Sequence, residues 1–297
     1  MAAYETAGLT PDGLPALRDV IRKHGLSARK SLGQNFILDL NLTAKISAVC
    51  GCLAGKTVVE VGPGPGGLTR ALLSGGARVI AVERDERCGL ALEEVAARWP
   101  GKLHVEMADA LEVNWRDLVE KYAPDATIAK DVFVIANLPY GIATKLLIGW
   151  LETEPWPPWY AGMALMFQKE VAERISAQPG SKVYGRLSVI SQWCCETRIA
   201  LSLPAAAFTP PPKVASAVVH FIPRTQRLPA CTAAALGSVT RAVFGQRRKM
   251  LRSSLKQVTP FPELLLTHAG IAPELRGEDV DVASFARLAE ALYEKSR

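Results

Sequence analysis

Residues 62–76 read GPGPGGLTRALLSGG and follow the apolar run TVVEV at 57–61. A glycine-rich turn that leads from a strand pattern into a helix pattern, which ends in glycine, is typical of α/β proteins. Further apolar runs, separated by helical stretches, occur at 78–83, 103–107, 132–137 and 163–167. Because strands that alternate with helices form parallel, doubly wound sheets, the sequence predicts an α/β domain of that kind.

The second half of the chain changes character near residue 225. Residues 215–221 (ASAVVHF) read as one more strand, and the proline-rich loop PAAAFTPPPKV at 204–214 precedes it. Residues 223–229 are typical of a linker, and the pattern after them is purely helical. We therefore expect an α/β catalytic domain over residues 1–225 and a small all-helical domain over 226–297.

Composition excludes several classes of protein. The 297 residues are 49% hydrophobic and 22% charged, and the net charge of +6 is compatible with a nucleic-acid partner without requiring one. The six cysteines form no C-x-x-C pair, which argues against a zinc site or a disulfide framework, so no metal is expected. No apolar run is long enough to span a membrane, and residues 1–17 lack Lys and Arg. These features favour a cytoplasmic protein.

The glycine turn indicates which cofactor to expect. Gly62, Gly64 and Gly67 match the dinucleotide fingerprint G-x-G-x-x-G. However, Pro63 and Pro65 each remove a backbone donor that a pyrophosphate would need, which argues against an NAD-linked oxidoreductase. A nucleoside ligand without phosphate fits better, and S-adenosylmethionine is the obvious candidate.

Two acidic residues follow the next two predicted strands. Glu83 ends the second strand, where a carboxylate can accept hydrogen bonds from both ribose hydroxyls. Asp109 follows the third strand and could accept the amino group of an adenine. Either residue alone could be a solvated strand end, but signals at three successive strand ends favour one pocket.

The motif NLPY at 137–140 follows the fourth predicted strand, where a methyl acceptor would lie. The amide oxygen of Asn137 and a backbone carbonyl near Leu138 could accept the two protons of an exocyclic amine, so no strong general base is required. Pro139 ends the strand, and Tyr140 could stack on the base. Phe208 is a candidate for the opposite face of the base, although a core position fits it equally well.

Seven motifs in the same order resemble the small-subunit ribosomal RNA adenine N6,N6-dimethyltransferases of the KsgA type. They are KSLGQNFILD (30–39), VVEVGPGPGGLT (58–69), NLPY, QKEVAERI (168–175), YGRLSV (184–189), FTPPPKVASAVV (208–219) and FGQRRKML (244–251). GQNF and NLPY are shared with the Erm macrolide-resistance methyltransferases, which act on large-subunit RNA. The FGQRRK stretch is closer to the small-subunit enzymes.

The resemblance implies roles for individual residues. It places Asn35, Ile37, Gly62, Glu83, Asp109 and Asn137 around a Rossmann-like S-adenosylmethionine pocket, and Asn137, Leu138, Pro139 and Tyr140 around the target adenine. It implies dimethylation of two adjacent adenosines in a hairpin near the 3′ end of 16S ribosomal RNA, within a pre-assembled 30S particle, by a monomeric enzyme that contributes to subunit biogenesis. Gly66-Gly67 departs from the family, which often has a non-glycine residue there.

A basic helix is predicted over residues 241–258. At about 100° per residue, Phe244, Leu251, Leu255 and Val258 share one face, which we expect to be buried. A flanking arc suited to RNA phosphates contains Arg241, Arg248, Lys249, Arg252 and Lys256. Arg247 lies near the apolar face and is expected to brace the helix against the first domain. A second basic cluster beside GQNF contains Arg22, Lys23, Arg29 and Lys30.

Three other functions remain to be weighed against small-subunit dimethylation. The NAD-linked oxidoreductase is already disfavoured by the two prolines of the glycine turn. An Erm-type enzyme would methylate large-subunit RNA instead. A non-catalytic RNA-binding or transcription-accessory relative would keep the fold without the chemistry. Intact NLPY, Glu83 and Asp109 argue against the non-catalytic relative, because a pure binder does not need a cofactor pocket.

Overall fold

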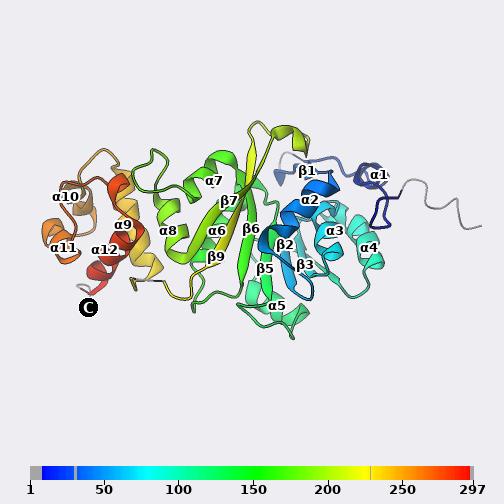
Figure 1. The fold of residues 1–297 in the computed structure, drawn as a ribbon, viewed down its shortest axis with the longest axis horizontal. Helices are drawn as coiled ribbons and strands as arrows, with labels where there is room; N and C mark the ends of the chain where they lie inside the picture. Colours follow the sequence, from blue (N-terminus) through cyan, green and yellow to red (C-terminus); the bar gives the residue numbers. More distant parts are fainter. Residues whose placement is uncertain (1–8, 30–31, 228, 295–297) are drawn as a thin grey trace, which may run out of the picture. The chain divides into compact units, whose positions relative to one another are not determined.

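The computed structural model describes residues 9–29, 32–227 and 229–294 (Figure 1). Within them the chain forms two compact units. The first unit takes the described residues of Met1–Leu147, Trp159–Lys169 and Ile199–His220, and the second takes those of Ile148–Pro158, Glu170–Arg198 and Phe221–Arg297. The units therefore interleave along the chain, and the domain boundary near residue 225 stays a prediction.

A seven-stranded sheet has the order β4-β3-β2-β5-β6-β9-β7. Its strands are β2 (Thr57–Val61), β3 (Arg78–Glu83), β4 (Leu103–Met107), β5 (Val132–Ala136), β6 (Gly162–Gln168), β7 (Cys195–Leu203) and β9 (Ser216–Pro223). The pairs β2–β3, β3–β4, β2–β5 and β5–β6 are parallel. The predicted doubly wound sheet is confirmed, and the strand order reverses between β2 and β5.

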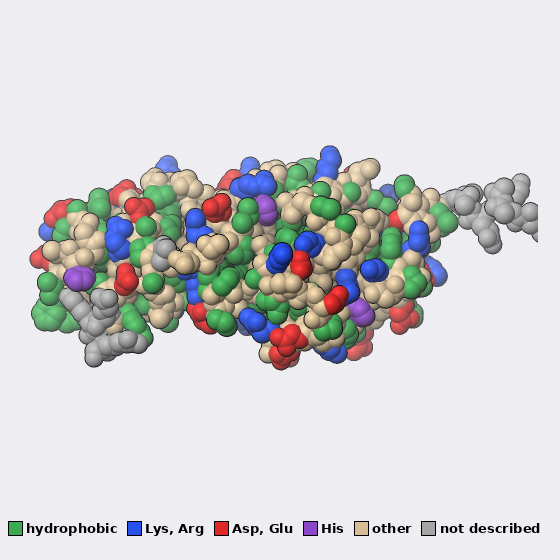
Figure 2. All heavy atoms as spheres, turned by 60° about the horizontal axis from the view of Figure 1, so that its bottom comes forward, with side chains coloured by type: hydrophobic (Ala, Val, Ile, Leu, Met, Phe, Trp, Pro, Cys, Tyr) green, Lys and Arg blue, Asp and Glu red, His purple; other side chains and the backbone are tan. Residues whose placement is uncertain are grey.

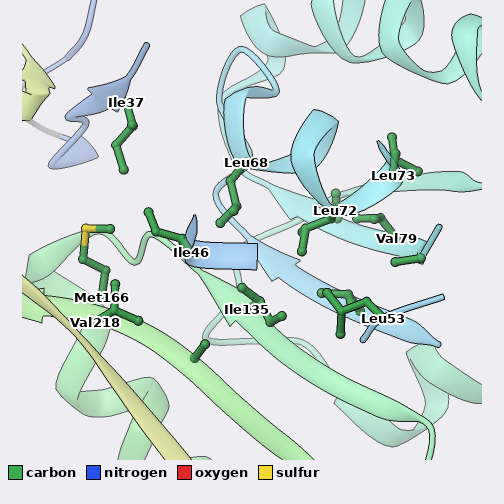
Figure 3. Packing of buried hydrophobic residues seen from close by; sticks show 14 of the residues in the cluster. Ile37, Ile46, Leu53, Leu68, Leu72, Leu73, Val79, Ile135, Met166 and Val218 are labelled. Carbon is green, nitrogen blue, oxygen red and sulfur yellow. The ribbon is translucent and has the colours of Figure 1, made fainter. Parts of the chain in front are cut away.

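Continuous apolar runs explain the central strands, which helices follow in turn. Each residue of β2 is buried, as expected for a strand covered on both faces. The helices after β2, β3, β4 and β5 are α3 (Gly67–Ser74), α4 (Gly89–Arg98), α5 (Trp115–Tyr122) and α6 (Tyr140–Leu151). A 3₁₀ turn, η3 (Glu86–Cys88), precedes α4. Ile46, Leu72, Val79 and Ile135 lie in the resulting core (Figure 3).

The segments that precede the sheet in the sequence belong to the first unit. They are α1 (Leu17–Lys23), β1 (Phe36–Ile37), α2 (Leu40–Ser47) and the 3₁₀ turn η2 (Ala48–Cys50). β1 pairs antiparallel with β8 (Phe208–Thr209), which follows the 3₁₀ turn η4 (Ala205–Ala207). Arg70 of α3 is 1% exposed and donates to the Asp12 carboxylate at 2.6 Å and to the Pro15 carbonyl at 2.8 Å. This buried ion pair ties the chain's first described residues to α3.

The second unit contains the C-terminal helices. Its elements are α7 (Lys169–Ile175), α8 (Arg186–Cys194), α9 (Ala233–Gly245), α10 (Leu251–Ser254), η5 (Leu255–Gln257), α11 (Pro262–His268), η6 (Gly277–Asp279) and α12 (Val282–Glu294). α9 packs against α8 and α12. Phe244 contacts the rings of Tyr184 and Phe285, and the Tyr184 hydroxyl donates to the Val280 carbonyl at 3.0 Å.

The prediction of one helix over residues 241–258 is wrong. α9 ends at Gly245, and Met250 forms a β-bridge with Arg276 before α10 begins. The amides of Leu251 and Arg252 donate to carbonyls of residues 275 and 273, so tertiary hydrogen bonds replace helical ones. The predicted division of faces nevertheless holds for Leu251 and Leu255, which are buried, and for the exposed residues Arg241, Arg248, Lys249, Arg252 and Lys256.

Arg247 is held within the second unit. Its Nε donates to Glu278 at 3.0 Å, and its guanidinium also donates to the Ser181 carbonyl at 3.4 Å. Both partners belong to the same unit as Arg247. Arg247 was expected to contact the first domain, but these hydrogen bonds lie within the second unit. Among the described residues, no helix has the length and apolar character needed to cross a membrane.

Gly277→Ala should destabilise the second unit. A Cβ at this position would lie 2.2 Å from Cγ1 of Val243, so α9 and η6 would have to shift, at a cost of about 1–3 kcal/mol. Equilibrium urea denaturation measures the change. The matched control is Gly237→Ala inside α9, where the described structure leaves the space open, so the variant should gain about 0.5–1 kcal/mol. Equal losses in both variants would contradict this steric account.

Candidate active site

A cavity of about 350 Å³ opens in the first unit at the carboxyl ends of β2, β3, β4 and β5. This is the edge where the strand order reverses and where ligands bind in open α/β sheets. Except for Phe208, the residues predicted for the cofactor and the target adenine lie on its wall: Asn35, Ile37, Gly62, Glu83, Asp109, Asn137, Leu138, Pro139 and Tyr140. The fold thus brings together segments that lie more than 100 residues apart in the chain.

The glycine turn between β2 and α3 has no backbone donor left for a phosphate over residues 62–66. The N–H of Gly62 donates to Val82, and that of Gly66 donates to Pro63. The N–H of Gly64 donates to the Glu83 carboxylate at 2.9 Å, and the other two residues are prolines. Gly64 also has a positive φ of 56°, and a Cβ there would lie 3.0 Å from the Phe36 ring. The turn therefore suits a ligand portion without phosphate.

Glu83 is 6% exposed and accepts hydrogen bonds from three backbone N–H groups, those of Gly64, Arg84 and Asp85, at 2.8–2.9 Å. Burial raises the pKa of its carboxyl, and these hydrogen bonds act against that rise. A carboxylate offers about four acceptor positions, and three are used by these N–H groups. The fourth position is on the oxygen that accepts from Gly64. That position can accept from one hydroxyl group of a ligand, and a second hydroxyl would have to share an occupied oxygen.

Asp109 forms the next part of the wall. One of its oxygens accepts from the Leu111 N–H at 3.0 Å, and the other lies 3.1 Å from the guanidinium of Arg84. The Arg84 side chain is 68% exposed, so it can move aside at little cost. Asp109 therefore keeps an acceptor at the cavity, as expected for a residue that binds an amino group.

Glu60 is a buried carboxyl that the sequence analysis missed. It lies on the cavity wall in β2, is 1% exposed, and accepts a hydrogen bond from the Thr69 hydroxyl at 2.7 Å. Burial raises its pKa from 4.5 to about 8, so the group is mostly protonated at neutral pH. The signal in the sequence was a glutamate inside a strand that is otherwise apolar.

The amide of Asn137 is oriented by the N-terminal motif. Its Nδ2 donates to the backbone carbonyl of Asn35 at 3.0 Å, which leaves Oδ1 as an acceptor. Leu138 is buried, and Pro139 lies against Gly33 and Gly62, where a Cβ would be 3.6–3.7 Å from its ring. The motif NLPY is therefore packed between the N-terminal motif and the glycine turn.

Tyr140 is anchored by a residue that the sequence analysis did not single out. Its hydroxyl lies 2.6 Å from the hydroxyl of Ser216, which is fully buried at the start of β9. Burial raises the pKa of Tyr140, so the phenol stays neutral. By contrast, the ring of Phe208 is 3% exposed and belongs to the hydrophobic core, next to Ile37. This geometry does not support a stacking role for Phe208, which stays a prediction.

Comparison with known proteins identifies the family. The family model described as "Ribosomal RNA adenine dimethylase" matches residues 25–294. The chain belongs to this family. A relative from Xanthobacter autotrophicus, named "Ribosomal RNA small subunit methyltransferase A", is 59% identical over 279 residues, which cover 94% of each chain. The predicted family and enzyme class, an RNA adenine dimethyltransferase, are confirmed.

Two solved structures support the fold of this dimethylase. A dimethyladenosine transferase from Plasmodium falciparum has a TM-score of 0.72 and 24% identity, and the match covers 87% of this chain and 97% of that one. The 23S rRNA methyltransferase ErmE has a TM-score of 0.64 and 25% identity, with 87% and 100% covered. The predicted Rossmann-like methyltransferase fold is confirmed, and the much higher identity to small-subunit relatives does not favour the Erm-type alternative.

The predicted RNA-binding residues of the dimethylase are not equally free. In the second unit Arg248, Lys249 and Lys256 are exposed, whereas Arg252 lies 3.7 Å from Glu274. In the cluster beside GQNF, Arg22 lies 3.6 Å from Asp19 and Lys23 lies 2.5 Å from Glu94. Arg29 is exposed, and Lys30 lies outside the described residues. On the face in Figure 2, Lys and Arg are interspersed with acidic side chains.

Glu60→Gln should change how the stability of the dimethylase depends on pH. Between about pH 4.5 and 8 the unfolded chain has lost the Glu60 proton while the folded chain keeps it. The free energy of unfolding should therefore fall as pH rises, by up to about 1.4 kcal/mol per pH unit, and the loss is complete above pH 8.

The glutamine of the variant carries no proton to lose, so the wild type should lose stability relative to the variant from pH 5 to pH 8. Urea denaturation of both proteins across this range tests the sign. Parallel curves would show that Glu60 is ionised in the folded protein.

Proposed function

We propose that this dimethylase transfers methyl groups from S-adenosylmethionine to the N6 amine of two adjacent adenosines near the 3′ end of 16S ribosomal RNA. The observation that carries the proposal is the Asn137 amide, which Asn35 holds through Nδ2 at 3.0 Å so that Oδ1 remains an acceptor at the cavity. Relatives at 55–59% identity are named "Ribosomal RNA small subunit methyltransferase A", which favours the small-subunit RNA as substrate.

The cavity fits S-adenosylmethionine by its donors and acceptors. The glycine turn offers no N–H to a pyrophosphate over residues 62–66, whereas Glu83 and Asp109 offer acceptors to hydroxyl and amino groups. Glu83 would hold the ribose and Asp109 the adenine, while Asn35, Ile37 and Gly62 would line the remainder. When bound, the cofactor supplies a methyl group on a positively charged sulfur.

The protein's own contribution is to orient the target amine. Asn137 Oδ1 would accept one of its protons, and the carbonyl of Leu138 would accept the other, because the Pro139 carbonyl already accepts from Ile142 and Ala143 of α6. Both hydrogen bonds favour a pyramidal nitrogen whose lone pair points at the methyl group. Placement at about 3–3.5 Å can supply several kcal/mol, so no general base is needed. Tyr140, held by Ser216, would stack on the base.

The alternatives fit less well. A non-catalytic RNA-binding relative would not require Glu83, Asp109 and Asn137 on one cavity wall. An Erm-type substrate is disfavoured by the relatives' names and identities. We propose that the enzyme works as a cytoplasmic monomer on a pre-assembled 30S particle. The basic residues that would contact the RNA backbone are Arg248, Lys249, Arg252 and Lys256 of the C-terminal region, together with Arg29 and Lys30.

Asn137→Ala should lower methyl transfer roughly 100-fold or more, because the orienting acceptor is lost at the reacting nitrogen. The assay combines the protein and labelled S-adenosylmethionine with either small subunits that lack dimethyladenosine or large subunits, and the product is mapped by mass spectrometry. Binding of the particle should persist in the variant. Wild-type protein that methylates the large-subunit RNA instead, or neither RNA, would refute the proposal. Near-normal turnover per folded variant would remove Asn137 from the chemistry.

Arg248→Ala combined with Lys249→Ala should weaken small-subunit binding and flatten its salt dependence. Each lost phosphate contact lowers the slope of log affinity against log salt by about 0.7–0.9. The matched control removes two exposed lysines at the amino ends of β4 and β5, Lys102→Ala with Lys130→Ala. Titrations at several salt concentrations should leave the control slope unchanged. Equal slopes for the two double variants would show that the C-terminal residues do not follow the RNA.

A further inference from the structure

Gln34 of the N-terminal motif has both ends of its side-chain amide occupied. Its Nε2 donates to Oδ2 of Asp85 at 2.9 Å, and its Oε1 accepts from the backbone N–H of Arg29 at 2.9 Å. Asp85 lies two residues after Glu83, at the end of β3. Gln34 therefore connects the N-terminal motif to the strand end that carries the proposed ribose-binding carboxylate.

Asp85 is a rigid partner for Gln34. It is 5% exposed, and the Arg87 guanidinium donates to both of its oxygens, at 2.9 Å and 2.6 Å. Those hydrogen bonds are the main reason that its pKa is lowered to about 2, so it stays ionised at neutral pH. Hydrogen bonds to a charged group are stronger than hydrogen bonds between neutral groups, so the Gln34–Asp85 hydrogen bond is a strong attachment between the two segments.

Both ends of this attachment lead to a predicted binding residue. The N–H of Asp85 donates to Oε1 of Glu83 at 2.8 Å. On the other side, Asn35 follows Gln34 directly, and its carbonyl holds the Asn137 amide. Consecutive Cα atoms are about 3.8 Å apart, so a displaced Gln34 would carry the Asn35 carbonyl with it. Arg87 also donates to the Ser27 carbonyl at 3.3 Å, which attaches the same segment at a second point.

We infer that Gln34 is a positioning residue that, through Asp85, fixes the cofactor-binding end of β3 and the Asn137 amide relative to each other. The inference rests on the proposed function. Neither Gln34 nor Asp85 needs to touch the reacting atoms. Loss of the attachment should weaken cofactor binding through Glu83 and slow turnover at saturating cofactor through Asn137.

A polarity swap tests the attachment. Gln34→Glu alone places two carboxylates against each other and should weaken S-adenosylmethionine binding by roughly tenfold or more and lower kcat by a similar factor. Asp85→Asn alone removes the charge that Gln34 and Arg87 contact. The affinity for S-adenosylmethionine and the kcat of this variant should lie between those of Gln34→Glu and those of the wild type. Combining Gln34→Glu with Asp85→Asn restores a donor opposite a carboxylate and keeps an acceptor for the Arg29 N–H. Arg87 Nη2 donates to the same Asp85 oxygen as Gln34, so the double variant still loses part of the Arg87 contact. Affinity and kcat of the double variant should therefore rise clearly above those of Gln34→Glu alone, without returning fully to the wild type.

Calorimetry with S-adenosylmethionine and single-turnover methylation of small subunits give the two readouts, each per folded molecule as counted by circular dichroism. Asp125→Asn is the matched control, because it weakens an exposed ion pair with Arg78 at the opposite end of β3. It should leave both readouts unchanged.

The outcomes separate this inference from the proposed function. Wild-type protein that does not bind S-adenosylmethionine would refute the proposed function itself. Wild-type protein that binds and methylates, with Gln34→Glu equal to it, would refute only the role of Gln34. A double variant no better than the weaker single variant would also refute that role, because a positioning hydrogen bond is rescued when its donor and acceptor are exchanged.

Discussion

The hydrogen bond from Asn137 to the Asn35 carbonyl is the contact on which the candidate site depends, because it joins the end of β5 to a segment 102 residues earlier in the chain. It orients the amide so that its oxygen is the free acceptor. The contact requires the N-terminal motif to lie over the sheet edge, which the pairing of β1 with β8 and the Gln34–Asp85 bond both secure. The candidate site thus depends on tertiary contacts that no short motif contains.

Much of the fold follows from local patterns in the sequence. The buried runs of β2, β3, β5 and β6 are mostly apolar, and such runs with helices between them leave few alternatives to a parallel sheet. β7 was not predicted, because most of its residues are partly or fully exposed and lack an apolar run. The helix expected over 241–258 breaks because residues 273–276 compete for its backbone hydrogen bonds, and the competing carbonyls are distant in sequence.

In the candidate site, too, some residues could be predicted from local sequence patterns and others could not. Glu83, Asp109 and Asn137 could be found because each follows a recognisable strand, and strand ends meet at one edge. Ser216 could not, since a serine inside a buried strand is unremarkable until its partner Tyr140, 76 residues away, is known. Gln34 belongs to the GQNF motif that the sequence shows, but its hydrogen-bond partner Asp85 lies 51 residues later and could not be predicted. Residue types at strand ends are predictable, whereas pairings between side chains require the fold.

The strand ends and the glycine turn present mainly acceptors to the cavity. The backbone donors of the glycine turn are used internally or by Glu83, while Glu83, Asp109 and Asn137 Oδ1 each keep acceptor capacity. This part of the wall disfavours phosphate, which needs donors, and favours hydroxyl groups, amino groups and positive charge. Burial keeps Glu60 mostly protonated, which limits the repulsion between it and Glu83 on the same wall. A nucleoside that carries a positively charged sulfur, with an adenine amine beside it, satisfies each of these conditions.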